Sequence, residues 1–157
     1  MMPVVPAPAA DIIKRHQADA PVKVGAIATD LGLSVVVSDL PLAVSGMLSK
    51  GKDNDQWTIR VNRHEHRHRQ RYTIAHEIAH FVLHRDAFGE ELIDDTFYRS
   101  GLSEQREYEA NALAAEILMP WPLIRKLMQE GQKTTSELAE RLQVSSAAMS
   151  IRLGLPT

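Results

Sequence analysis

One pentapeptide constrains this chain more than any other feature: residues 76–80 read His-Glu-Ile-Ala-His. On a helix, His76 and His80 lie on one face, about 6 Å apart along the axis. Two imidazole nitrogens at that spacing can reach one metal ion at about 2.0–2.1 Å. Glu77 follows the first histidine, where it can take a proton from a water molecule that the metal activates. The pattern predicts a zinc-dependent hydrolase, and among hydrolases a peptidase.

A second stretch, residues 64–68, also matches the letters H-E-x-x-H. A catalytic zinc helix is mostly buried, so the residues around its ligands should be uncharged. Residues around 76–80 are largely apolar, whereas Arg63, Arg67 and Arg69 surround the other stretch. Burying unpaired arginines is costly, and their charge opposes a bound cation. We therefore predict the metal site at 76–80 and interpret 64–68 as a solvated basic loop that leads into the helix.

A catalytic zinc site has three protein ligands and one open position, so two histidines are not sufficient. His84 follows His80 by four residues and is one candidate for the third ligand. However, His76 and His84 are about 12 Å apart along one helix axis, too far to share an ion. We interpret His84 as a residue that caps the helix or contacts a ligand.

Better candidates for the third ligand lie in residues 107–111, Glu-Tyr-Glu-Ala-Asn, on a second predicted helix. Glu107 and Glu109 point about 200° apart around a helix, so only one of them can face the metal. Asn111 lies four residues after Glu107, where it can hold a ligand histidine through its second ring nitrogen. We favour Glu107 as the ligand and keep Glu109 as the alternative. Both can also be read as part of a solvated helix face.

Size and composition predict one globular domain over residues 1–157, with residues 1–8 loose because prolines interrupt them. The absence of cysteine excludes disulfides, cysteine zinc sites and thiol catalysis. The chain has no signal-peptide pattern and no apolar run of membrane-spanning length, so we expect a cytoplasmic protein with no membrane partner. The net charge of −2 argues against strong non-specific nucleic-acid binding by the whole chain.

Periodicity and capping residues predict an α+β fold, in which a small, mostly antiparallel sheet precedes the zinc helix. The expected strands cover 34–38, 44–49 and 56–61. The expected helices cover 9–17, 21–31, 67–84, 104–119, 123–130, 137–142 and a last segment ending at Leu153. Ser103 is the expected N-cap of the second ligand helix, Thr135 or Ser136 that of the sixth, and Ser145 or Ser146 that of the last. The acidic segment 86–99 is expected to be irregular and mobile.

The strand 56–61 is a candidate to pair with an extended substrate as a sheet edge, with Trp57, Ile59, Val61 and Tyr72 as substrate-binding residues. It can equally be an ordinary edge strand. Charge developing on the substrate during hydrolysis can be stabilised by Tyr72, Tyr98, Arg99 or a loop histidine, and the sequence does not choose among them. Arginines crowd residues 60–71 and form either a solvated loop or a basic rim that helps to select the substrate.

Two long segments resemble the ImmA/IrrE family of metallopeptidases: residues 71–84, RYTIAHEIAHFVLH, and residues 107–120, EYEANALAAEILMP. The resemblance extends over about residues 20–155. It implies a zincin-like fold with Zn²⁺ held between two helices by His76, His80 and Glu107. It also implies Glu77 as the catalytic base. The implied partner is a helix-turn-helix transcriptional repressor encoded nearby, whose cleavage relieves repression under stress.

Two other functions fit parts of the chain. Residues 134–155 have the helix, turn, helix pattern of a DNA-binding module. However, Arg152 is the only basic residue of the second helix, so DNA binding is not favoured. The chain can also be the partner-binding component of a toxin–antitoxin or repressor pair with little proteolysis. An intact His76, Glu77 and His80 argue against an inactive enzyme.

Overall fold

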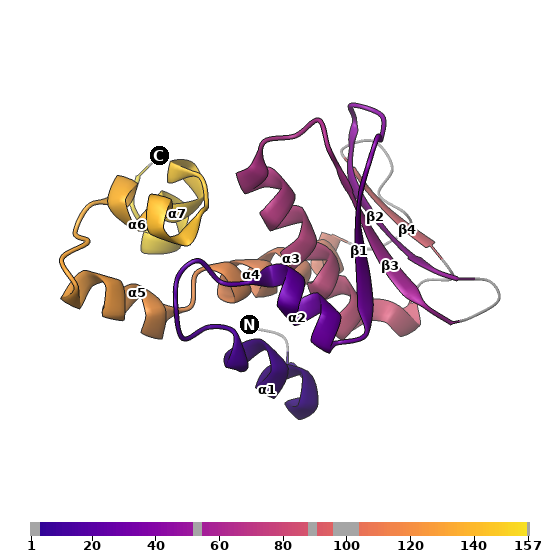
Figure 1. Ribbon diagram of the computed structural model, residues 1–157, viewed down its shortest axis with the longest axis horizontal. Helices are drawn as coiled ribbons and strands as arrows, with labels where there is room; N and C mark the ends of the chain where they lie inside the picture. The colour runs from indigo at the N-terminus through magenta and orange to yellow at the C-terminus, as the bar shows by residue number, and fades with distance from the viewer. Residues whose placement is uncertain (1–3, 52–54, 88–90, 96–103, 157) are drawn as a thin grey trace.

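The computed structural model describes residues 4–51, 55–87, 91–95 and 104–156. It shows a mixed sheet on one side of the molecule and a set of helices packed against it (Figure 1). The strands are β1 (Leu33–Ser38), β2 (Val44–Lys50), β3 (Trp57–Asn62) and β4 (Glu91–Asp95). The helices are α1 (Ala7–Arg15), α2 (Val24–Asp30), α3 (Arg67–His84), α4 (Glu104–Leu118), α5 (Trp121–Gln129), α6 (Thr135–Leu142) and α7 (Ser146–Leu153). The predicted α+β class is confirmed.

The sheet has the strand order β1-β3-β2-β4. β3 pairs in parallel with β1 and antiparallel with β2, and β2 pairs antiparallel with β4. Two of the three pairings are antiparallel, in agreement with the predicted sheet. β3 is therefore an interior strand, with a neighbour on each side.

The interior position of β3 corrects the prediction that this strand binds substrate through a free edge. The backbone groups of β3 are used by β1 and β2. Ile59 and Val61 are buried in the core, and the Trp57 ring packs edge-on against Phe81 with 5.8 Å between ring centroids. Trp57, Ile59 and Val61 thus stabilise the fold. Alternating polarity within a segment cannot reveal which strand becomes central, because that depends on strands distant in sequence.

The central helix α3 runs over the predicted range, from Arg67 to His84. His66 is its N-cap, and its Nδ1 accepts a hydrogen bond from the backbone N–H of His68. The helix packs against β2 and β3 on one side and α4 on the other (Figure 1). Ala75, Ile78 and Ala79 are fully buried in these contacts. Small side chains allow close approach, so α3 passes through the centre of the core.

The residue at which α3 begins distinguishes the two H-E-x-x-H matches as candidate metal sites. His64 precedes the helix and contacts the Asp39 carboxylate, whereas His68 lies in the first turn of α3. These two histidines therefore do not lie four residues apart on one helical face. The interpretation of residues 64–68 as a segment leading into the helix agrees with the structure.

The helix α4 carries the second predicted motif and contacts α3 along much of its length. Its buried side is formed by Ala110, Leu113, Ala114, Ile117 and Leu118. Its predicted N-cap, Ser103, lies outside the described residues. No helix in the described ranges is both long and apolar enough to cross a membrane.

The C-terminal pair α6 and α7 has well-defined N-termini. Thr134 forms a capping box with Glu137 at the start of α6, one residue before the predicted cap. Ser145 caps α7, as one of the two predicted choices. The turn between them is closed by Gln143 in the left-handed region, with φ of 56°.

The acidic segment after α3 contains more regular structure than the sequence indicated. A short 3₁₀ turn, η1 (Arg85–Ala87), follows α3, and the fourth strand covers residues 91–95. This strand was expected to be irregular because its acidic side chains have low strand propensity. Pairing with β2 overrides that propensity. Tyr98 and Arg99 lie outside the described residues.

Candidate metal centre

The donor atoms of His76, His80 and Glu107 lie within 4.8 Å of one another where α3 and α4 meet. The Glu107 Oε1 atom is 2.9 Å from His80 Nε2, and its Oε2 atom is 3.3 Å from His76 Nε2. The two imidazole rings are perpendicular to each other, with centroids 4.6 Å apart. One turn of α3 thus presents two nitrogens to a carboxylate from α4.

The chemistry of these donors fits a divalent cation. Two imidazole nitrogens and one carboxylate oxygen match a catalytic zinc site, in which ligands at about 2.0–2.2 Å lie about 3.4 Å from each other. His80 is fully buried and His76 is nearly so. Such a set of three ligands leaves a fourth position for a reacting group.

The electrostatic environment keeps Glu107 ionised. Burial opposes ionisation, but hydrogen bonds with His76 and His80 outweigh it and hold the pKa of Glu107 well below its usual value. A carboxylate that stays charged across the ordinary pH range is suited to bind a cation.

Glu77 is fully buried between α3 and β2. It lies one position after His76 and three before His80, so it borders the face of α3 that carries the two histidines. The backbone of β2 comes close to it at Gly46, where an added Cβ atom would lie 3.6 Å from Glu77 Oε2. The predicted catalytic base thus lies at the interface where α3 packs against the sheet.

His84 and Glu109 form a polar chain behind the donor cluster. His80 Nδ1 and His84 Nδ1 are 3.1 Å apart, and His84 Nε2 is 2.9 Å from Glu109 Oε1. The carboxylate of Glu109, kept as the alternative ligand, therefore lies at His84 and outside the cluster of donors. His84 itself contacts a predicted ligand, as the sequence analysis expected.

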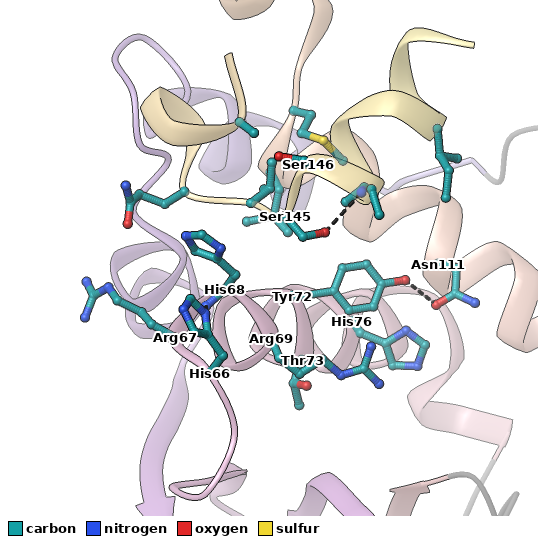
Figure 2. Close-up of a pocket in the computed structure, with 18 of the residues that line it drawn as sticks. His66, Arg67, His68, Arg69, Tyr72, Thr73, His76, Asn111, Ser145 and Ser146 are labelled. Carbon is teal, nitrogen blue, oxygen red and sulfur yellow. Dashed lines mark hydrogen bonds between the residues drawn. The ribbon is translucent and has the colours of Figure 1, made fainter. Parts of the chain in front are cut away.

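Asn111 has a different contact from the one predicted. It was expected to hold a ligand histidine, whereas its Oδ1 accepts a hydrogen bond of 2.6 Å from the hydroxyl of Tyr72 (Figure 2). The Tyr72 ring lies near His76, with 6.1 Å between ring centroids. The spacing of four residues placed Asn111 on the correct helix side, but the direction of its side chain depends on its neighbour on α3.

Gly46 was not recognised from the sequence. A Cβ atom there would lie 2.4 Å from Thr73 Cγ2 and 3.0 Å from the Arg60 carbonyl oxygen. Only glycine lets β2 approach α3 this closely. A glycine within a predicted strand is the available signal for such an approach.

A large cleft of about 1430 Å³ opens beside the donor cluster and reaches the C-terminal pair. His76, Glu107, Tyr72 and Asn111 line one end, and the first residues of α3 line the other (Figure 2). The opposite wall is formed by α6 and α7, including Ser145, Ser146, Ala147 and Ile151. The helix pair that resembled a DNA-binding module therefore faces the candidate metal site.

The peptidase family described as the IrrE N-terminal-like domain matches residues 28–154. The chain belongs to this family. Membership in the IrrE N-terminal-like family supports a metallopeptidase-type function, which agrees with the donor cluster on α3 and α4. Comparison with curated proteins gives no match.

Among solved structures, a Mycobacterium tuberculosis transcriptional regulator is similar over 94% of this chain, with a TM-score of 0.63 and 18% sequence identity. The match covers 46% of that regulator's chain, so this member of the IrrE N-terminal-like family spans less than half of its length. At this identity the likeness shows the shared fold.

Proposed function

We propose that this protein is a zinc-dependent endopeptidase that hydrolyses a specific peptide bond. The observation that carries the proposal is the approach of His76, His80 and Glu107 within 4.8 Å at one end of a large cleft. Membership in a peptidase family supports the same reaction class. Bound zinc would polarise the scissile carbonyl and activate a water molecule for attack.

The residues of the chain have distinct roles in this proposal. His76 and His80 present neutral imidazole nitrogens, and Glu107 contributes a charged carboxylate. Glu77 accepts a proton from the attacking water and passes it to the leaving amine. Tyr72 lines the cleft near His76, and in this proposal its hydroxyl would exchange its hydrogen bond to Asn111 for one to the substrate carbonyl.

The proposed substrate is a helix-turn-helix transcriptional repressor encoded near this gene, as the resemblance to the ImmA/IrrE family implies. Cleavage would inactivate the repressor and relieve repression. Direct DNA recognition by α7 is less well supported, because Arg152 donates a hydrogen bond of 2.9 Å to the Met119 carbonyl and lies over the Trp121 ring.

The test uses purified protein, zinc and the neighbouring repressor. We expect one cleavage site, found by mass spectrometry of the products, and loss of cleavage on addition of a chelator. Glu77→Gln should keep zinc but lose at least about 100-fold in cleavage rate, the contribution of a general base. His80→Ala should lose both zinc and cleavage. Full activity of Glu77→Gln would refute the assignment.

A further inference from the structure

The wall of the cleft formed by the start of α3 is strongly basic. His66, Arg67, His68 and Arg69 all line it, and Figure 2 shows the first three at the end away from His76 and Asn111. Both arginines are exposed. The pKa of His68 is lowered by burial and by the positive charge of His66, Arg71 and Arg67, which indicates a local excess of positive charge.

Neither Arg67 nor Arg69 forms an ion pair within the described part of the chain. Arg69 contacts the Ser45 hydroxyl at 3.4 Å, and its guanidinium lies 5.5 Å from the centre of the Tyr72 ring. Ser45 in turn donates a hydrogen bond to the Glu65 carboxylate. Two arginine side chains therefore face the cleft with donors available for an anionic group.

The opposite wall has a different character. On α7, Ala147, Ala148 and Ile151 line the cleft, and Ile151 is 69% exposed although it is a large apolar residue. The acidic groups on the cleft surface are Glu107, held between two histidines, and Glu140 on α6. An occupant of the cleft thus meets arginines on one side and an apolar helix face on the other.

We propose that this cleft binds a peptide segment that places separate acidic side chains against Arg67 and Arg69 and an apolar side chain against Ile151. The proposal deepens the proposed endopeptidase function and rests on it, because it assigns these residues to substrate selection. Arg67 and Arg69 would each determine specificity for one acidic side chain, through charge-assisted hydrogen bonds from a guanidinium to a carboxylate.

The helix geometry also gives the expected position of the acidic residue. Arg67 precedes His76 by nine residues, or about 13 Å along the helix axis, and Figure 2 shows its side chain at the end of the cleft away from His76. An extended peptide covers about 3.3 Å per residue, so this distance corresponds to about four residues. The acidic side chain at Arg67 should therefore lie about four positions from the scissile bond. The Arg69 guanidinium reaches back to the Tyr72 ring, so an acidic side chain there should lie nearer that bond.

A peptide accounts for the cleft better than a nucleic acid does. The end beside His76 carries the Glu107 carboxylate, and Glu140 lies on the opposite wall, so a phosphate backbone along the cleft would meet negative charge. The net charge of −2 also disfavours a polyanion. The apolar face of α7 offers no cation to bind phosphate within the residues that line the cleft.

The test measures binding and does not require turnover. Labelled dodecapeptide pools, random except for a fixed central Glu, Gln or Lys, are titrated with the full-length Glu77→Gln protein, with and without added zinc. We expect the Glu pool to bind most tightly and the Lys pool least tightly. Arg67→Glu and Arg69→Glu should each weaken binding of the Glu pool by about two- to fivefold, the range of an exposed ion pair.

Arg125→Glu is the charge-matched control, because Arg125 is exposed on α5 and lies outside the cleft. It should bind the three pools as the parent protein does, and Arg67→Lys should keep the preference for Glu. Equal binding of the three pools, or the same loss in Arg125→Glu, would overturn the proposal. So would tighter binding of a labelled random DNA oligonucleotide that Arg67→Glu abolishes.

A second experiment separates this proposal from the endopeptidase assignment. The zinc-loaded protein is incubated with a peptide library, and the cleaved products are sequenced. Enrichment of Asp or Glu about four positions from the cleaved bond, lost in Arg67→Glu, supports both the endopeptidase function and the assignment of the cleft. If no peptide is cleaved but the binding preference for Glu remains, the endopeptidase function fails and the assignment of the cleft stands. Cleavage without that enrichment contradicts the assignment of the cleft alone.

Discussion

At the scale of single residues, the candidate site depends on buried polar side chains whose partners come from other elements. His80 lies between Glu107 on one side and His84 on the other, and Glu109 contacts the far nitrogen of His84. Partners of this kind orient a ligand imidazole and fix which of its nitrogens faces the metal. The pair of His84 and Glu109 is therefore expected to influence the metal without contacting it.

His84→Ala is predicted to weaken zinc binding by about 10–100-fold while leaving the three donor residues in place. Zinc affinity can be measured by competition with a chromophoric chelator. Glu104→Gln, on the exposed first turn of α4, is the control and should bind zinc normally. An unchanged affinity in His84→Ala would show that this histidine serves packing alone.

Gly46→Ala is predicted to lower the free energy of unfolding by about 1–3 kcal/mol, the usual effect of overpacking. The new methyl group would lie 2.4 Å from Thr73 Cγ2 and 3.0 Å from a backbone oxygen, so strand and helix must separate. Urea denaturation measures the effect. Gly25→Ala is the matched control, because nothing lies within 4 Å of a Cβ atom there. Adding Thr73→Ser to Gly46→Ala should recover part of the loss.

At the scale of elements, hydrogen bonds at the helix N-termini fix where α6 and α7, which line the cleft, begin. The capping box at Thr134 starts α6, and the side chain of Ser145 starts α7. Hydrogen bonds from the backbone of Lys133 and Thr134, and from the Thr134 side chain, hold the pKa of Glu137 below its usual value. An ionised Glu137 therefore stabilises the start of α6.

Glu137→Gln is predicted to destabilise the protein at neutral pH and to have little effect in acid. The pKa of Glu137 is lower in the folded state, so its stabilising contribution is present above the unfolded value of 4.5 and is lost as the pH falls below it. Denaturation curves of the variant and the parent protein at neutral and acidic pH measure this. Glu140→Gln, one turn later on α6, should show no such pH-dependent difference. A loss that persists unchanged in acid would contradict the prediction.

At the scale of the whole molecule, two arginines join the C-terminal pair α6 and α7 to the helices α3 and α4 that carry the donor cluster. Arg71 of α3 is buried and donates hydrogen bonds to the carbonyls of Val22, Leu142 and Gln143. Arg152 of α7 donates to Met119 at the end of α4. These links explain why α6 and α7 form a wall of the cleft.

Arg71→Met is predicted to lower the free energy of unfolding by about 2–4 kcal/mol, because several buried carbonyls lose a charged donor. The methionine keeps much of the apolar volume, so the loss reports on hydrogen bonding. Chemical denaturation measures it, with Arg63→Met, an exposed arginine nearby in sequence, as the control. Equal stability of the two variants would show that Arg71 does not hold the C-terminal pair in place.

Sequence reasoning was most successful where the deciding interactions are local. The spacing of four between His76 and His80, and of four between Glu107 and Asn111, follows from helix periodicity alone. The approximate range expected for the zinc helix, residues 67–84, agrees with α3. The boundaries of other helices differ by a few residues. At α6 the cap is Thr134, because it competes successfully with the adjacent Thr135 and Ser136.

Other features depend on contacts between residues far apart in the chain. The pairing of β1 with β3 makes β3 an interior strand, so its backbone groups are not free to pair with a substrate strand as predicted. The hydrogen bond from the Tyr72 hydroxyl determines where the Asn111 side chain points. The Thr73 methyl group leaves no room for a Cβ atom at position 46, so that position requires glycine.

The sequence by itself determined which donor types the candidate site contains, because helix geometry places two histidines at ligand spacing and the residue types fix the donor atoms. Only the tertiary structure decided that Glu107 and not Glu109 completes the donor cluster, and that α7 faces the cleft. The physical reason is that periodicity acts over one helical turn, whereas the packing of α3 on α4 and the hydrogen bonds from Arg71 to the Leu142 and Gln143 carbonyls join residues tens of positions apart.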